Sequence, residues 1–310
     1  MPGKELTIGE VEAFARTCGP VVQVTLTGGS PELRSDLAAI AHLFLQHCRP
    51  MNMTLCSNGN YPAKLESDVR AIYEKAPHCR LTVDISVDAL HEDHDRLRNA
   101  RGLFDRVLES YDRLSRVRER YPRLRLGCGL CVSGLNKTTA LATARWAMNN
   151  LPLDNFTPIL VRGTPQNPEA LGTDRDVFLA IASEVEQRLR AGSFRGYAML
   201  PGIVNRKDII QKRLIAQIHR TGHSPIRCSA ARETAVIYPD GTVAGCEIRE
   251  EMLGDLREHG MDIAKIWRSD AARAFRKTIH KEACTCWHQC FLSPTIIKSP
   301  ALWLSPEGIE

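Results

Sequence analysis

Five cysteines near the C-terminal end of the chain have the side-chain type and the spacing of a metal centre. Two of them frame a Pro-Asp-Gly turn in the segment 228–246, and three follow in the run CTCWHQC. Thiolates bind both zinc and iron–sulfur clusters, and spacing alone does not choose between them. Since four ligands complete such a site, Cys284 is the first that we set aside. The candidate metal ligands are Cys228, Cys246, Cys284, Cys286 and Cys290.

Alternating strand and helix patterns occupy most of the chain before these cysteines. Apolar, β-branched runs predict buried parallel strands, and each run is followed by a helical pattern. Such a series implies a parallel sheet with right-handed crossovers, either curled toward a barrel or doubly wound. A helix over residues 6–18 precedes the first strand and is expected as an orphan helix of the same sheet, which makes that strand an edge. The predicted strands are 21–27, 51–59, 80–87, 124–132 and 155–161.

Length and composition limit the class of protein. The 310 residues, 43% of them apolar, suffice for one to two domains. No run reaches the roughly 18 apolar residues of a membrane span, and no signal-peptide pattern opens the sequence. Eleven cysteines without a secretory signal favour a reducing compartment, which we expect to be the cytoplasm. Because the net charge of +5 is spread among 36 acidic residues, neither a membrane nor a nucleic-acid partner is indicated.

Two sets of polar or reactive residues within the strand–helix region are interpreted as supporting the fold rather than as parts of a site. Cys128 and Cys131 lie three positions apart in a predicted strand, so their side chains point to opposite faces and are read as core residues. His94, Asp95 and Arg98 follow the third strand and are read as a polar group that braces a loop.

The order of several motifs resembles that of radical S-adenosylmethionine (SAM) enzymes. LTGGSPELRSDL at 26–37, LCSNG at 55–59 and DISVDALHEDHDRLRN at 84–99 stand in the family's order. The segment from PIRC at 225 to CTCWHQCF ending at 291 resembles the SPASM/twitch extension, which holds an auxiliary iron–sulfur cluster. The resemblance covers residues 6–291.

The resemblance implies an α/β fold in two parts. It implies a partial parallel (β/α)6 TIM-like barrel missing its first strand, followed by a small Cys-rich α+β auxiliary-cluster domain. The expected division is a radical SAM core at 1–200, a connector at 201–223 and a SPASM/twitch-like domain at 224–310. The segment 193–223 has no clear pattern and is expected as an ill-defined connector that contributes to the substrate cavity.

The resemblance also implies cofactors and the residues that contact them. An auxiliary 4Fe–4S cluster would bind the C-terminal cysteines, with His288 beside it rather than among the ligands. SAM would lie at the carboxyl ends of the strands, where barrel sites form. The implied SAM contacts are Gly28, Gly29, Ser30, Ser86, Asp88, Asn136 and Arg162.

Two departures from the family pattern change the expected activity. The defining Cys-x3-Cys-x2-Cys loop, which holds the catalytic 4Fe–4S cluster, does not occur in the sequence, and Ser30 stands where the family usually has Glu. The family cleaves SAM to a 5′-deoxyadenosyl radical with that cluster. We therefore assign no catalytic residue, expect SAM binding to be weak or lost, and expect the chain as written to be an inactive, truncated form.

Three function classes follow. The first is a radical SAM enzyme that acts on a small-molecule or peptide substrate and is reduced by a protein such as flavodoxin or ferredoxin. The second is a non-catalytic iron–sulfur pseudoenzyme for binding or electron relay. The third is a zinc-stabilised interaction module. An upstream Cys-x3-Cys-x2-Cys segment would favour the first class, and metal and sulfide analysis separates the third from the other two.

Overall fold

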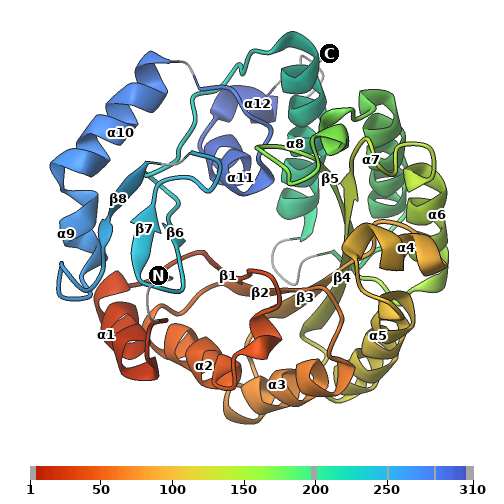
Figure 1. Cartoon of the computed structure of the whole chain (residues 1–310), viewed down its shortest axis with the longest axis horizontal. Coiled ribbons are helices and arrows are strands. Elements are labelled where there is room, and N and C mark those ends of the chain that lie inside the picture. The colour runs from red at the N-terminus through yellow and green to blue at the C-terminus, as the bar shows by residue number, and fades with distance from the viewer. Residues whose placement is uncertain (1–4, 197–200, 250, 283, 305–310) are drawn as a thin grey trace. The chain divides into compact units, whose positions relative to one another are not determined.

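The computed structural model describes residues 5–196, 201–249, 251–282 and 284–304 (Figure 1). The chain forms two compact units. A sheet unit comprises residues 20–161 and 165–205, and a cysteine unit comprises residues 1–19, 162–164 and 206–310. None of the helices in the described ranges combines the length and the apolar character that a bilayer span requires.

The sheet unit contains the predicted parallel sheet. Its strands follow one another in chain order, each hydrogen-bonded to the next, as in a partial TIM-like barrel. This confirms the expected fold class, and β1 lies at an edge of the described sheet as predicted. The strands are β1 (Gln23–Leu26), β2 (Asn52–Ser57), β3 (Leu81–Ser86), β4 (Leu124–Val132) and β5 (Asn155–Leu160).

Helices follow the strands and bury one face of the sheet. The predicted helix after β1 is split, because Arg34 is extended and its guanidinium pairs with Asp36 at 2.9 Å, so α2 begins only at Leu37. The main helices are α2 (Leu37–His47), α3 (Pro62–Lys75), α5 (Leu103–Arg120), α6 (Ala140–Asn150) and α7 (Arg175–Arg190). Shorter helices are the α-helix α4 (His91–Arg98) and the 3-10 helices η1 (Pro31–Leu33) and η2 (Pro168–Leu171).

The two faces of the sheet differ in polarity. Side chains alternate along a strand, so Leu81, Val83 and Ile85 of β3 share one face and are at most 1% exposed. The opposite face is polar, and the strand register aligns Asp84 with Gly127 and Gly127 with Asn155 in one row. A Cβ atom on Gly127 would lie 1.7 Å from Asp84 Oδ1, so this glycine makes room for the carboxylate.

The cysteine unit combines a small antiparallel sheet with helices. The sheet has the order β6 (Val236–Ile237), β7 (Thr242–Ala244) and β8 (Met252–Asp255). Residues 201–221, expected as part of an ill-defined connector, instead form the 21-residue helix α8 (Pro201–Thr221), whose polar-rich sequence hid its periodicity. The other helices are α1 (Ile8–Cys18), α9 (Ile263–Trp267), α10 (Asp270–Lys281), α11 (Gln289–Ile297) and α12 (Pro300–Leu304).

Helix α1 belongs to the cysteine unit, which corrects its expected place as an orphan helix of the barrel. Its N-terminus has a capping box, since Glu10 N donates to Thr7 Oγ1 and Glu10 Oε2 accepts from Thr7 N. Leu6 N donates to Pro239 O at 2.6 Å, and Arg257 Nε donates to Glu10 Oε1 at 2.6 Å. These long-range contacts had no local sequence signal.

The Glu10–Arg257 pair predicts an acid-sensitive attachment of α1. The Arg257 guanidinium, together with Thr7, lowers the pKa of Glu10 from 4.5 to about 2. A carboxylate with a lowered folded-state pKa adds stability above its unfolded pKa, and that stability is lost as the pH falls from 4.5 toward 2. We expect Glu10→Gln to remove this part of the acid dependence of the urea midpoint. Glu12→Gln, which alters an exposed ion pair with Arg16 on the same helix, is the control and should keep it. An identical pH profile for Glu10→Gln and the wild type would contradict this role.

Candidate functional site

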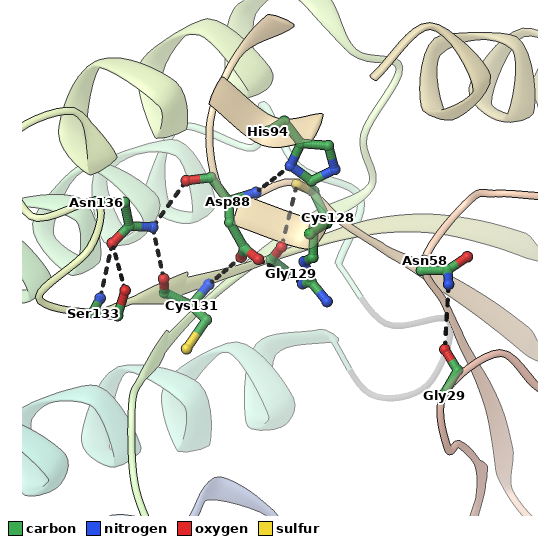
Figure 2. A network of polar contacts seen from close by, with 10 residues as sticks. Gly29, Asn58, Asp88, His94, Cys128, Gly129, Cys131, Ser133 and Asn136 are labelled. Atoms are coloured by element: carbon green, nitrogen blue, oxygen red, sulfur yellow. Dashed lines mark hydrogen bonds and ion pairs between the residues drawn. The ribbon is translucent and has the colours of Figure 1, made fainter. Parts of the chain in front are cut away.

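The turns after β1 and β2 are tied together and leave glycine backbone open. Gly28 has φ 141°, and a Cβ atom on Gly28 or Gly29 would meet nothing within 4 Å. Ser30 Oγ donates to Asn58 Oδ1 at 3.1 Å. Asn58 Nδ2 in turn donates to Gly29 O at 3.4 Å (Figure 2). A ligand could therefore approach this backbone closely without displacing a side chain.

A buried carboxylate beside these turns was missed from the sequence. Glu32, two residues after Ser30, is 1% exposed. Its Oε1 accepts a 2.5 Å hydrogen bond from Ser57 Oγ, which in turn accepts from Gly59 N. Within the described part of the chain, Glu32 Oε2 has no hydrogen-bond partner. Glu32 therefore holds the turn after β2 in place through Ser57.

Asp88 and Asn136 form the centre of a polar network after β3 and β4 (Figure 2). Asp88 Oδ1 accepts from Cys131 N at 2.8 Å, and Oδ2 pairs with Arg98 at 2.6 Å. Asn136 Nδ2 donates to Asp88 O and to Cys131 O, both at 2.8 Å. Asn136 Oδ1 accepts from Ser133 N at 2.9 Å and from Ser133 Oγ at 3.2 Å. The Asn136 amide is therefore fully used inside the protein.

The loop-bracing interpretation of the segment after β3 is confirmed. Asp88 N donates to His94 Nδ1 at 3.2 Å, and His94 is completely buried, which lowers its pKa. Asp95 Oδ1 accepts from Phe104 N at 2.9 Å, and its other oxygen accepts from Gly102 N. Ser86, by contrast, is only half-buried and pairs in register with Gly129. The roles of Gly28, Gly29, Ser30, Ser86, Asp88 and Asn136 as SAM contacts stay predictions.

The network predicts a large stability effect at Asp88. Asp88→Ala would leave the Cys131 N–H and the Arg98 guanidinium without their acceptor. We expect a decrease of about 2–4 kcal/mol in the free energy of unfolding, measured by urea denaturation. Ser86→Ala is the matched control on the same strand end and should cost less than about 1 kcal/mol. Equal effects of the two substitutions would contradict the bracing role of Asp88.

The two cysteines of CGLC point to opposite faces of β4, as predicted. Cys128 is fully buried on the helix-covered face, and burial raises the pKa of its thiol strongly. Cys131 is half-buried on the polar face. The two thiols are therefore not placed to bind the same metal ion.

Four of the C-terminal cysteines lie close enough together for electrostatic interactions among them. Burial raises the pKa of the Cys228 thiol, and the charges of Cys284 and Cys246 add to this. Burial likewise raises the pKa of Cys286 to about 12, with further contributions from Cys228, Cys284 and Cys246. The pKa of Cys284 is raised by burial and then by Cys246. Thiolates that destabilise one another when unbound are arranged for a shared cation.

Backbone amides point at three of these sulfur atoms. Ala230 N donates to Cys228 Sγ at 3.5 Å, and Ile248 N donates to Cys246 Sγ at 3.4 Å. A backbone hydrogen bond from His288 reaches Cys286 and lowers the pKa of that thiol. Each donor lies two residues after its cysteine. Such N–H···S bonds stabilise thiolate ligands and tune the potential of iron–sulfur clusters.

The fifth cysteine has different neighbours. The pKa of Cys290 is raised by burial and by Glu247 rather than by the other four thiols. His288 caps α11, and its Nδ1 accepts from Cys290 N at 3.2 Å, so Nε2 carries the proton toward Glu247 Oε1. Arg162 Nη2 donates to Glu247 Oε1 at 3.0 Å, and His288 and Arg162 together lower the pKa of Glu247 to about 2. Burial lowers the pKa of His288 itself, so it stays neutral.

The donor set fits an iron–sulfur cluster in chemistry. Cys228, Cys246, Cys284 and Cys286 carry the soft sulfur atoms that such clusters require, and backbone N–H groups reach three of the four sulfur atoms. In the described ranges, no three His, Cys, Asp or Glu side chains already stand in a metal-binding arrangement. The predicted SAM contact Arg162 is paired with Glu247, and its contact with SAM stays a prediction.

Family models identify both parts of the chain. The radical SAM superfamily model matches residues 1–146, and the SPASM iron–sulfur cluster-binding domain matches residues 228–291. The chain therefore contains a radical SAM domain followed by a SPASM domain. Its SPASM domain contains all five candidate cysteines, so a radical SAM-type iron–sulfur protein is the class that the matches support.

Solved structures share the fold of this radical SAM protein. A hexahistidine-tagged anSMEcpe with bound AdoMet has a TM-score of 0.58 at 14% identity, covering 88% of this chain and 71% of that one. Native anSMEcpe with bound AdoMet has a TM-score of 0.59 at 13% identity, covering 88% and 74%. Native anSMEcpe with AdoMet and the Cp18Cys peptide has a TM-score of 0.56 at 14% identity, covering 89% and 75%. At these identities the likeness shows the fold alone. No curated protein matches the sequence.

Proposed function

We propose that this chain binds one auxiliary 4Fe–4S cluster on its SPASM cysteines and binds SAM at the carboxyl edge of its parallel sheet. The observation that carries the proposal is the group of four neighbouring thiols, three of which accept backbone N–H bonds. Zinc could use the same thiols, so sulfide content is the decisive distinction.

We assign the cluster to Cys228, Cys246, Cys284 and Cys286, with Cys290 as the cysteine left over. In addition to burial, the pKa of Cys228 is raised by Cys284 and Cys246, and these three cysteines raise the pKa of Cys286. The charged groups that act on Cys290 are instead Glu247, Arg162 and Lys207. This assignment reverses our order of preference from spacing, which set Cys284 aside. His288 stays beside the cluster, because its two ring nitrogens are used by Cys290 N and Glu247.

We assign the SAM contacts according to which backbone and side-chain groups are not already used in hydrogen bonds within the protein. Gly28 and Gly29 leave backbone open to a ligand, and Ser86 has a half-buried hydroxyl. Asp88 and Asn136 act chiefly by positioning the loops around that edge. In radical SAM proteins the bound cofactors supply reductive cleavage of SAM to a 5′-deoxyadenosyl radical. The substrate is a small molecule or a peptide, and the electrons come from a flavodoxin-type or ferredoxin-type protein.

We further propose that residues 1–310 alone do not carry out that cleavage. The sequence contains no Cys-x3-Cys-x2-Cys motif, and the SPASM thiols are expected to saturate the irons of the auxiliary cluster. For these residues on their own, the absent motif favours a second function, a non-catalytic iron–sulfur protein for binding or electron relay. The proposed division is a core at 1–200, a connecting segment at 201–223 and a SPASM domain at 224–310, with the cytoplasm as its compartment.

SAM binding tests the role of the open glycine turn. We expect Gly29→Leu to weaken SAM binding at least about tenfold in equilibrium dialysis, because the new side chain would occupy the space above the turn. The melting temperature should stay the same, since a Cβ atom there meets nothing within 4 Å. Gly9→Leu, at another glycine with open space, is the control. Unchanged SAM binding by Gly29→Leu would place the cofactor elsewhere.

A further inference from the structure

A groove along α10 is lined by basic side chains alone. It encloses a volume of about 380 Å³ at the surface of the cysteine unit. Five of its six lining side chains carry permanent positive charge, and the sixth is a histidine. The lining residues, which we call the α10 basic groove, are Arg232, Arg273, Arg276, Lys277, His280 and Lys281.

The periodicity of α10 builds this surface. Ala272, Phe275 and Ile279 are at most 4% exposed and fasten the helix to the rest of the unit. On the opposite face, Arg273, Lys277 and Lys281 are exposed and four residues apart. At a rise of about 1.5 Å per residue, they form a row of about 12 Å. Three cations along one row suit an extended acidic surface better than a single small anion.

The positive charge of the groove is largely unbalanced. Arg273 pairs with Asp270 at 2.6 Å. Within the described ranges, no carboxylate is within ion-pair distance of Arg232, Lys277 or Lys281. Nearby acids serve other cations, since Glu282 pairs with Arg249 and Glu233 pairs with Lys298.

The helix dipole does not explain the positions of all the basic residues in the α10 basic groove. His280 and Lys281 lie in the last turn of α10, where the helix dipole favours cations. Arg273 lies near the opposite end, and Arg232 comes from a different segment. Arg276 does not supply a free fork for a phosphate, because it donates to Ala231 O at 3.1 Å and to Trp267 O at 3.0 Å. This arrangement favours a broad acidic partner.

The groove lies next to the proposed cluster ligands within the same unit. A Cβ atom on Gly245 would lie 2.4 Å from Phe275 Cε1, so the α10 ring packs on the backbone immediately before Cys246. At its other end, α10 finishes at Lys281, three residues before Cys284. A protein docked on the exposed face of α10 would therefore be separated from the backbone before Cys246 by one helix diameter, roughly 10–12 Å.

We propose that the α10 basic groove docks the acidic face of a one-electron donor protein, which reduces the SPASM cluster. The inference rests on the proposed function, since it requires the cluster as electron acceptor. The step balances simply: one electron leaves the reduced donor and one enters the cluster, and no bond forms or breaks. Charge complementarity speeds the encounter and makes it sensitive to salt.

The test compares two double charge reversals. Arg232→Glu/Lys277→Glu alters the groove, and Arg220→Glu/Lys265→Glu changes the same charge at exposed positions of the same unit outside it. With an acidic flavodoxin as the probe, we expect the second-order rate of cluster reduction at low ionic strength to fall at least about tenfold in the groove variant. The control should change less than about twofold, and dithionite should reduce all three proteins equally.

Binding of the oxidised flavodoxin, followed by its flavin fluorescence anisotropy, decides the inference separately from the cluster. If the chain holds no iron and sulfide, the proposed function fails, while groove-dependent binding would still support the docking surface. Binding and reduction that are equal in both variants and insensitive to salt would overturn the inference. A short DNA duplex that bound through the groove residues while the flavodoxin did not would also overturn it.

Discussion

After reconstitution with iron and sulfide under strong reductant, residues 1–310 alone are expected to release no 5′-deoxyadenosine from SAM above background. SAM cleavage needs an iron with an open coordination position. The four SPASM thiols are expected to fill those positions in their own cluster, and the sequence has no Cys-x3-Cys-x2-Cys motif to hold a second one. We therefore expect residues 1–310 to show no SAM cleavage at all, rather than cleavage at a reduced rate.

The matched protein for this experiment carries an added N-terminal segment. A strand followed by a Cys-x3-Cys-x2-Cys loop, about 20–40 residues joined before Met1, should restore formation of 5′-deoxyadenosine. Release of this product by residues 1–310 would mean that a catalytic cluster sits on cysteines assigned here to other roles. If the extended chain stayed inert, the non-catalytic iron–sulfur function would be favoured instead.

Removal of one cluster ligand should abolish most metal binding. We expect Cys246→Ala and Cys286→Ala each to lose more than about half of the bound iron and sulfide, because three thiols leave one iron without its protein ligand. Cys290→Ala should retain most of both, since that thiol faces Glu247 and Arg162. Cys131→Ala, a half-buried cysteine of the sheet unit, is the control and should have wild-type iron content.

Stability should follow metal content in these variants. Ligand binding to the folded state alone raises its stability, so the cluster-free variants should melt earlier, chiefly in the cysteine unit. Protection from hydrogen exchange in β6–β8 measures this local effect. If Cys290→Ala lost the cluster and Cys284→Ala kept it, the choice of Cys284 over Cys290 would be wrong.

The sheet could be predicted because its strands carry a strong local signal. Residues 124–132 are buried on alternate positions, and the predicted strand coincides with β4. The place of α1 could not be predicted in this way. Its contacts run from Leu6 to Pro239 and from Glu10 to Arg257, and nothing in a window around α1 indicates such distant partners. Helix α8 was missed since its many polar residues weaken the apolar stripe.

The candidate sites were predictable where a residue type carries the chemistry. The C-terminal cysteines stood out by type and spacing, and Gly28-Gly29 by its place after a strand. Residues that act through tertiary contacts could not be identified from the sequence. Glu32 gains its role from burial against Ser57, and Glu247 from pairing with Arg162 and His288. The Gly127 gap, which admits Asp84, had a signal in the alternating glycines of LGCGL that could have been used.

The composition of the bound metal tests the central claim most directly. After anaerobic purification, the chain should contain iron and acid-labile sulfide in near-equal amounts if the four SPASM thiols hold an iron–sulfur cluster, as we propose. The measurement is a metal analysis by mass spectrometry together with a sulfide assay on the same sample. Stoichiometric zinc without sulfide would contradict the account and would make the C-terminal cysteines the ligands of a structural zinc site.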